Sequence, residues 1–286
     1  MDIKKVGVVG AGVMGCGIAH VTAMNGIDVV LRDIDQKYLD NALDKMEQSM
    51  ARSIQKGRLT DEERLKTLSH IAFTTDVNDL ADVDLLIEAV VENIELKKSV
   101  FSELDKICKP ETIFASNTSS MSITELAVST ERSNRFCGIH FFNPVQIMKL
   151  VEIVSSELTD DDVIDVSRKY TESIGKTPVH VKKDMPGFIV NRLLVPYLNE
   201  AVRLLEEGVA SVEDIDTAVR LGLNYPLGPF QMLDMGGIDL TVSVLDYFAE
   251  EYNDSSYAPR MTLRQMQRSG KTGKNGTDGF YKHEEE

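Results

Sequence analysis

The sequence of 286 residues has no tryptophan, and aromatic residues make up only 6% of it. It has three cysteines, Cys16, Cys108 and Cys137, which form no Cys-x-x-Cys pair and leave one over in any scheme of disulfides. These cysteines indicate a reducing compartment. No pattern in the sequence predicts a metal site.

Long apolar runs are also missing, and no stretch approaches the length that spans a membrane. The first residues, 1–5, lead directly into an apolar strand pattern, which leaves no room for a signal or transit segment. We therefore expect a cytoplasmic protein.

Positive charge is scarce, because 31 Lys and Arg residues face 46 Asp and Glu residues and give a net charge of -15. Such an acidic chain repels nucleic acid and anionic membranes, so neither is expected as a partner. The 42% of hydrophobic and 27% of charged residues are typical of a globular chain. Small ligands that carry phosphate would need local positive sites.

Short apolar runs alternate with helical segments over the first two thirds of the chain. We predict strands at 3–9, 28–31, 71–74, 83–89, 112–115, 135–141, 150–154 and 179–181. Helices are expected after the first strand and at 94–107 and 123–128, and a long polar segment, 35–69, is predicted to hold two more. The second of these opens at Thr60, with Glu63 at capping-box spacing. This alternation predicts an α/β fold with a Rossmann-type, doubly wound, largely parallel sheet and a helical insertion.

The character of the sequence changes at Pro186-Gly187, beyond which apolar residues recur at helical period. A helix is predicted at about 188–207, with Pro196 inside it, and a second one begins near Ser211. We therefore expect an α/β domain at 1–186 and an all-helical domain at 187–286.

A glycine pattern, Gly10-Ala11-Gly12-Val13-Met14-Gly15, follows the first strand and opens the first helix. Alone it is a weak signal, because any tight turn can use glycines. In this context Gly10 permits the turn, Gly12 lets the backbone approach a pyrophosphate, and Gly15 allows close packing of helix and strand. The pattern predicts a dinucleotide cofactor.

Asp33 ends the second strand, where a carboxylate would accept hydrogen bonds from the adenosine ribose of that cofactor. A solvated acid at the end of a strand is the alternative. Because a carboxylate would repel a 2′-phosphate, Asp33 favours NAD over NADP, although the neighbouring Arg32 argues in the other direction.

A second group of candidates lies in the strands at 135–141 and 150–154. His140 stands at the carboxyl end of an apolar strand, where α/β sheets bind ligands. Glu152 is embedded in an apolar strand, so its charge requires a partner. A structural histidine and a surface acid are the alternative. Ser119 and Asn191 could likewise serve only turn and surface roles.

Taken together, six motifs in order resemble the 3-hydroxyacyl-CoA dehydrogenase family, closest to its short-chain bacterial 3-hydroxybutyryl-CoA members. They are the glycine pattern at 10–15, Ile-Glu-Ala-Val-Val-Glu-Asn at 87–93, Ala-Ser-Asn-Thr-Ser-Ser at 115–120, His-Phe-Phe-Asn-Pro at 140–144, Pro-Gly-Phe-Ile-Val-Asn-Arg at 186–192 and Pro-Leu-Gly-Pro-Phe at 226–230. The ending at 273–283 follows the family's glycine-rich ending only loosely.

The resemblance implies an enzyme that interconverts (S)-3-hydroxyacyl-CoA and 3-ketoacyl-CoA with NAD. It implies that residues 1–186 bind NAD and that residues 187–286 serve substrate binding and dimerisation, in a homodimer or an assembly of dimers. His140 becomes the catalytic base and Glu152 its partner, while Ser119 and Asn191 contact substrate and nicotinamide. Further cofactor contacts fall on Met14, Glu92, Lys97 and Asn143, and contacts to coenzyme A phosphates fall on Arg52 and Lys56.

Alternatives remain open. Arg52 and Lys56 are equally typical of an ordinary helix surface. A sibling dehydrogenase could act on a longer or dicarboxylic acyl-CoA or on a free hydroxy acid. A non-catalytic protein, crystallin-like or NAD-sensing, is a further class, which the joint presence of His140, Glu152, Ser119 and Asn191 disfavours.

Overall fold

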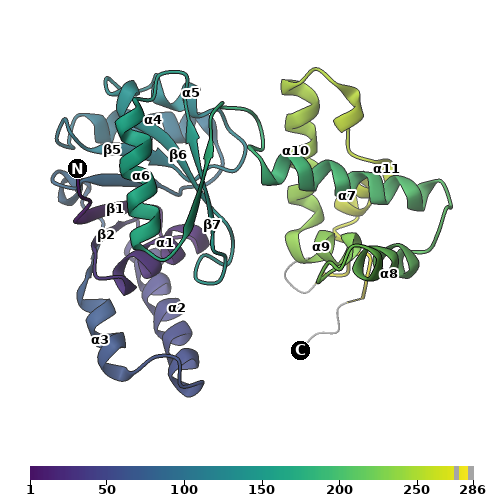
Figure 1. Cartoon of the computed structure of the whole chain (residues 1–286), viewed down its shortest axis with the longest axis horizontal. Helices are drawn as coiled ribbons and strands as arrows, with labels where there is room; N and C mark the ends of the chain where they lie inside the picture. Colours follow the sequence, from purple (N-terminus) through teal and green to yellow (C-terminus); the bar gives the residue numbers. More distant parts are fainter. Residues whose placement is uncertain (274–276, 283–286) are drawn as a thin grey trace. The chain divides into compact units, whose positions relative to one another are not determined.

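The computed structural model describes residues 1–273 and 277–282, and it divides into two compact units, Met1–Met185 and Pro186–Glu286 (Figure 1). The division falls one residue before the expected boundary, since Pro186 is part of the second unit. Of the ending at 273–283, residues 274–276 and 283 lie outside the described residues, as do residues 284–286.

Unit 1 is built on one eight-stranded sheet with the order β3-β2-β1-β4-β5-β6-β7-β8. Neighbouring strands are parallel except β6 and β7, which are antiparallel. The expected Rossmann-type, largely parallel sheet is thereby confirmed. The strands are β1 (Lys5–Val9), β2 (Asp28–Arg32), β3 (Ile71–Thr74), β4 (Leu85–Glu88), β5 (Ile113–Ser116), β6 (Phe136–Phe141), β7 (Leu150–Ser155) and β8 (Thr177–Val181).

Helices cover both faces of this sheet, because alternate residues of a strand point to opposite faces. On one face, α1 (Val13–Met24), α2 (Gln36–Gln55) and α6 (Asp161–Ser173) share a buried apolar core with the sheet. On the other face lie α4 (Ile94–Asp105) and α5 (Ile123–Ala127). There the ring of Phe101 in α4 packs 4.6 Å, centroid to centroid, from that of Phe136 in β6.

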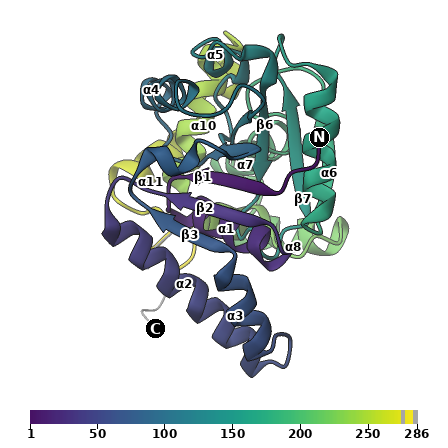
Figure 2. The ribbon, with the colours of Figure 1, turned by 90° about the vertical axis from the view of Figure 1, so that its left-hand side faces the viewer.

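The helical insertion consists of α2 and α3 (Asp61–Ser69), which contact each other and project beyond the β3 edge of the sheet (Figure 2). The capping box is present as predicted. The Thr60 hydroxyl accepts the Glu63 N–H at 3.2 Å, and the Thr60 N–H donates to the Glu63 carboxylate at 2.8 Å. Buried residues from Leu39 to Met50 fix α2 to the core, so its last turn lies beyond the part that is held there.

Unit 2 contains α7 (Val190–Glu206), α8 (Val212–Gly222), α9 (Pro229–Gly236), α10 (Ile238–Glu251) and α11 (Met261–Arg268). The helices surround a core that includes Phe230 and Phe248. The Asp234 carboxylate accepts the N–H groups of Phe280 at 2.8 Å and Tyr281 at 2.9 Å, so this part of the ending is fixed to the core. Within residues 1–273 and 277–282, no helix is both long and apolar enough to cross a membrane.

Candidate active site

The three glycines between β1 and α1 have different surroundings. Gly10 has φ of +102°, and a Cβ there would lie 2.6 Å from the Ala89 carbonyl oxygen, so only glycine fits. A Cβ on Gly15 would lie 1.7 Å from the Gly10 oxygen, which shows how tightly α1 packs on the turn. A Cβ on Gly12 would meet no protein atom within 4 Å. The protein's own packing therefore does not require glycine at position 12.

The open space beside Gly12 lies at the N-terminus of α1, for which Gly12 is the N-cap and supplies no side-chain hydrogen bond. The first N–H groups of a helix have no partner within it, and the helix dipole adds partial positive charge there. Such an end binds phosphate groups well. These residues fit the pyrophosphate of a dinucleotide.

A cavity of about 320 Å³ adjoins this helix end, a size suited to part of a small-molecule ligand. Asp33 lies in its wall, where its two carboxylate oxygens accept the N–H groups of Ala11 at 2.6 Å and Ile34 at 2.7 Å. Each oxygen keeps a second lone pair for a hydroxyl group. The lining is completed by Val9, Gly10, Gly12, Arg32, Ile34, Tyr38, Ala89, Val90, Val91, Leu96 and Val100. A largely apolar pocket with one carboxylate fits an adenosine.

His140 and Glu152 lie directly opposite each other in the antiparallel pair of β6 and β7. The distance from His140 Nδ1 to Glu152 Oε2 is 2.8 Å, and both residues are buried, at 3% and 0% exposure. Glu152 thus has the partner that its burial requires. With a carboxylate at Nδ1, the proton is held on that nitrogen, and Nε2 carries the lone pair that can take part in proton transfer.

Ser119 stands on the loop that follows β5, and its hydroxyl oxygen lies 3.0 Å from His140 Nε2. The Phe142 ring lies 4.5 Å from the His140 ring, centroid to centroid, and covers part of it. Asn117 fixes the same loop to β6, because its side-chain oxygen accepts the Phe141 N–H at 2.9 Å. A hydroxyl group and a histidine nitrogen are therefore held together at the carboxyl ends of β5 and β6.

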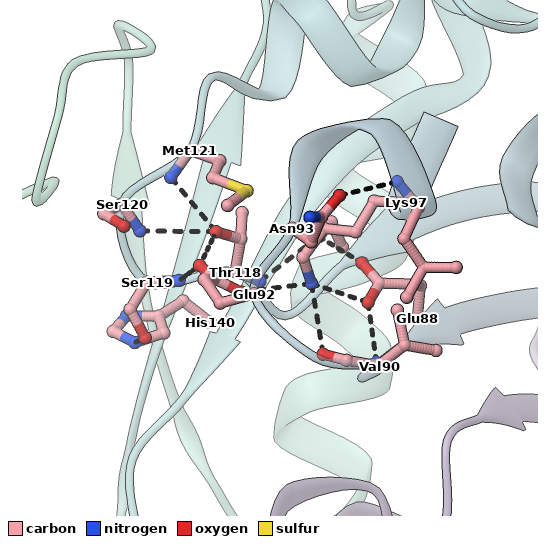
Figure 3. Close-up of polar contacts among 12 residues, drawn as sticks. Glu88, Val90, Glu92, Asn93, Lys97, Thr118, Ser119, Ser120, Met121 and His140 are labelled. Carbon is pink, nitrogen blue, oxygen red and sulfur yellow. Dashed lines mark hydrogen bonds and ion pairs between the residues drawn. The ribbon is translucent and has the colours of Figure 1, made fainter. Parts of the chain in front are cut away.

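Glu92 and Lys97 follow β4 and meet a residue that sequence reasoning did not select, Glu88 (Figure 3). The Lys97 ammonium is buried, 2.6 Å from Glu88 Oε1 and 3.1 Å from Glu92 Oε2. Burial raises the pKa of the Glu88 carboxyl, against the effect of the Lys97 charge and of hydrogen bonds from Lys97, Ser116 and Val90. The signal that would have found Glu88 is the one that selected Glu152, a charge inside an apolar strand run.

The remaining predicted residues belong to other segments of the chain. Arg52 and Lys56 are exposed at the last turn of α2, one turn apart, and within the described residues neither forms an ion pair. Met14 is half-buried in the first turn of α1, and Asn143 is exposed just after β6. Asn191 belongs to unit 2, in the first turn of α7. In the part of the chain that the structure describes, no cluster of histidine, cysteine or acidic residues could hold a metal ion.

Two family models match the chain almost end to end. Residues 5–185 match "3-hydroxyacyl-CoA dehydrogenase, NAD binding domain", and residues 187–283 match "3-hydroxyacyl-CoA dehydrogenase, C-terminal domain".

Curated relatives and solved structures agree with the two models. A 3-hydroxybutyryl-CoA dehydrogenase of Bradyrhizobium diazoefficiens is 45% identical over 98% of this chain and 95% of its own length. The human mitochondrial hydroxyacyl-coenzyme A dehydrogenase is 44% identical over 98% of this chain and 91% of its own. The crystal structure of (S)-3-hydroxybutyryl-CoA dehydrogenase from Ralstonia eutropha has a TM-score of 0.96 at 40% identity, covering 99% of this chain and 100% of that one.

Proposed function

The chain belongs to the 3-hydroxyacyl-CoA dehydrogenase family, and we propose that it interconverts (S)-3-hydroxybutyryl-CoA and acetoacetyl-CoA with NAD. It is an NAD-dependent oxidoreductase. The observation that carries the proposed chemistry is the buried contact of His140 with Glu152, which leaves Nε2 beside the Ser119 hydroxyl.

In the oxidation, a secondary alcohol loses a proton from oxygen and a hydride from carbon. His140 Nε2 takes the proton, since an imidazole nitrogen within hydrogen-bond reach of the hydroxyl acts as a general base. Glu152 holds Nδ1 protonated and stabilises the imidazolium that forms. The chemistry that NAD supplies when bound is hydride acceptance in this direction and hydride donation in the other.

In the reduction, protonated His140 returns the proton to the forming alkoxide. Ser119 and Asn191 orient the substrate oxygen in both directions. Gly10, Gly12, Met14 and Gly15 hold the pyrophosphate side of the cofactor and Asp33 its adenosine ribose, while Asn143, Glu92 and Lys97 complete the cofactor site.

Arg52 and Lys56 bind the phosphates of coenzyme A. Their exposure on the projecting end of α2 and the absence of ion pairs at both within the described residues support this assignment. In a chain with a net charge of -15, an unpaired pair of cations one turn apart is a local positive site. It favours a thioester over the free hydroxy acid.

The same proposal assigns NAD binding to residues 1–186 and dimerisation to residues 187–286, in a cytoplasmic homodimer or an assembly of dimers. Unit 2 supports the dimer with large apolar side chains exposed to water, including Leu193 at 71%, Leu221 at 78% and Met235 at 68%. Apolar surface of this kind is typical of interfaces. Light scattering coupled to gel filtration should give twice the chain mass or a multiple of it, and a monomer would reject this part.

The test of the reaction is a substrate panel on the purified protein. Acetoacetyl-CoA, longer and dicarboxylic 3-ketoacyl-CoAs and free acetoacetate are each supplied with NADH or NADPH, and cofactor oxidation is followed. We expect the highest kcat/KM with acetoacetyl-CoA and NADH. Preference for free acetoacetate, or no turnover of any thioester, would refute the proposed function.

A further inference from the structure

Glu88 ends β4 between two strands of the sheet, in register with Val9 of β1 and Ser116 of β5. It is completely buried. Three donors surround its carboxylate. The Val90 N–H, at 2.7 Å, and the Lys97 ammonium, at 2.6 Å, donate to Oε1, and the Ser116 hydroxyl donates to Oε2 at 2.7 Å.

A direct path leads from Glu88 to the loop after β5. The Ser116 hydroxyl donates to Glu88 and accepts the Thr118 N–H at 3.2 Å. The Asn117 N–H donates to the Glu88 carbonyl oxygen at 2.9 Å. Glu88 therefore holds the beginning of this loop through both its side chain and its backbone.

A second path runs through Lys97 and Glu92 (Figure 3). Lys97 is 1% exposed and lies between the two carboxylates, so its charge draws Glu92 inward. Glu92 then accepts the Thr118 hydroxyl and, at 3.3 Å, the Ser119 N–H. The Thr118 oxygen accepts two further N–H groups, those of Ser120 at 3.3 Å and Met121 at 3.0 Å. This path fixes the second half of the loop.

The first path fixes the residues that precede Ser119, and the second reaches Ser119 itself, whose hydroxyl lies 3.0 Å from His140 Nε2. We propose that Glu88 is a positioning residue for the reaction, which holds the loop of residues 116–121 so that Ser119 stays in line with His140. The inference rests on the proposed function, because it concerns the alignment of that acid–base pair. The Val90 N–H and the Lys97 ammonium fix the carboxylate itself, and the Ser116 hydroxyl would lose its charge-assisted hydrogen bond to that carboxylate if the loop moved.

The variant Glu88→Gln keeps the shape of the side chain, removes the charge and places an amide among groups that donate. We expect it to lower kcat for acetoacetyl-CoA reduction by about tenfold to a hundredfold, the effect of a misplacement near 1 Å. KM for acetoacetyl-CoA should change less than kcat.

The matched control is Asp105→Asn. Asp105 forms a similarly buried ion pair with Arg132, with both side chains 10% exposed, and it contacts none of the residues of the loop in the interactions described. We expect this variant to be less stable and to keep the wild-type kcat. The comparison separates a loss of stability from a loss of alignment.

The decisive measurement repeats Glu88→Gln in a Ser119→Ala background. If Glu88 acts through Ser119, adding Glu88→Gln to the Ser119→Ala variant should lower kcat by less than about threefold. The effects of substitutions within one interacting network are not additive. An equal loss in both backgrounds would overturn the inference, and so would wild-type kcat in Glu88→Gln. A wild-type protein without acetoacetyl-CoA reductase activity would instead reject the proposed function.

Should Glu88→Gln fail to fold, Thr118→Val takes its place in the same cycle. Valine keeps the shape of threonine and removes the hydroxyl group that donates a hydrogen bond to Glu92. A loss of kcat that disappears in the Ser119→Ala background supports the second path, and a loss that persists contradicts it.

Discussion

The glycine loop offers a variant that separates folding from cofactor binding. In Gly12→Ala, the new methyl group would meet no protein atom within 4 Å, and the φ of -66° at this position suits alanine. Alanine is a poorer N-cap than glycine by roughly 0.5–1 kcal/mol. It also restricts the unfolded chain, which stabilises the fold by about 0.4–1 kcal/mol. The free energy of unfolding should therefore stay within about 1 kcal/mol of the wild-type value.

Cofactor affinity should respond differently if the pyrophosphate binds at this helix end as proposed, because the methyl group would then occupy the space that it needs. A pyrophosphate displaced from the helix end loses at least one charge-assisted hydrogen bond, worth about 1.5–3 kcal/mol. That corresponds to a Kd for NADH that is about tenfold to a hundredfold higher.

Gly15→Ala is the matched comparison. Its Cβ would lie 1.7 Å from the Gly10 oxygen, so the backbone must move, and we expect a loss of about 3 kcal/mol or more in unfolding free energy. Urea unfolding and fluorescence titration with NADH measure the two quantities. A folded Gly12→Ala protein that binds NADH with wild-type affinity would refute the assignment of this helix end to the pyrophosphate.

Three further outcomes are expected. Glu152→Gln removes the charge that stabilises the His140 imidazolium and should lower kcat by about tenfold to a hundredfold with NADH affinity unchanged; wild-type kcat would contradict it. The double variant Arg52→Ala, Lys56→Ala should raise KM for acetoacetyl-CoA but not for NADH. The control, Lys37→Ala with Lys45→Ala, removes the same charge from the same helix and should leave both KM values unchanged. Equal effects of the two double variants would argue against a local phosphate site. Burial lowers the pKa of His20 from 6.5 to about 4. Between these pH values the unfolded chain binds a proton at His20 and the folded chain does not. The free energy of unfolding should therefore fall by about 3 kcal/mol as the pH drops through that interval. His20→Gln should flatten the acid side of the stability curve, and an unchanged curve in this variant would contradict the assignment.

Local signals predicted most of the fold. Thr60 and Glu63 lie three residues apart, so one short segment of the sequence was enough to predict their capping box. The strand β3 has the predicted bounds, Ile71–Thr74. The reversed direction of β7 was not predicted, because the direction of a strand depends on how its neighbours pair and not on its own residues. The helix α6, at Asp161–Ser173, was not named either, although Val163 and Val166 are buried in it.

The site was predicted only in part, for a related reason. Its own strand pattern showed only that Glu152 needs a partner, and the family resemblance named His140. The register of β6 and β7 places His140 opposite Glu152. The three donors to Glu88 lie 2, 9 and 28 residues further along the chain, so no single spacing rule reveals the cluster. Charges inside apolar strands are the signal, and their partners come from the tertiary structure.

The central claim is that His140 transfers the proton in an NAD-dependent reaction of a 3-hydroxyacyl-CoA. The most direct measurement is kcat for acetoacetyl-CoA reduction by NADH in the wild type and in His140→Gln, with the Kd for NADH determined on both proteins. We expect kcat to fall by about a hundredfold to ten-thousandfold, the range for loss of a general acid–base group, while the Kd stays unchanged. A His140→Gln protein that turns over at close to the wild-type rate would contradict it.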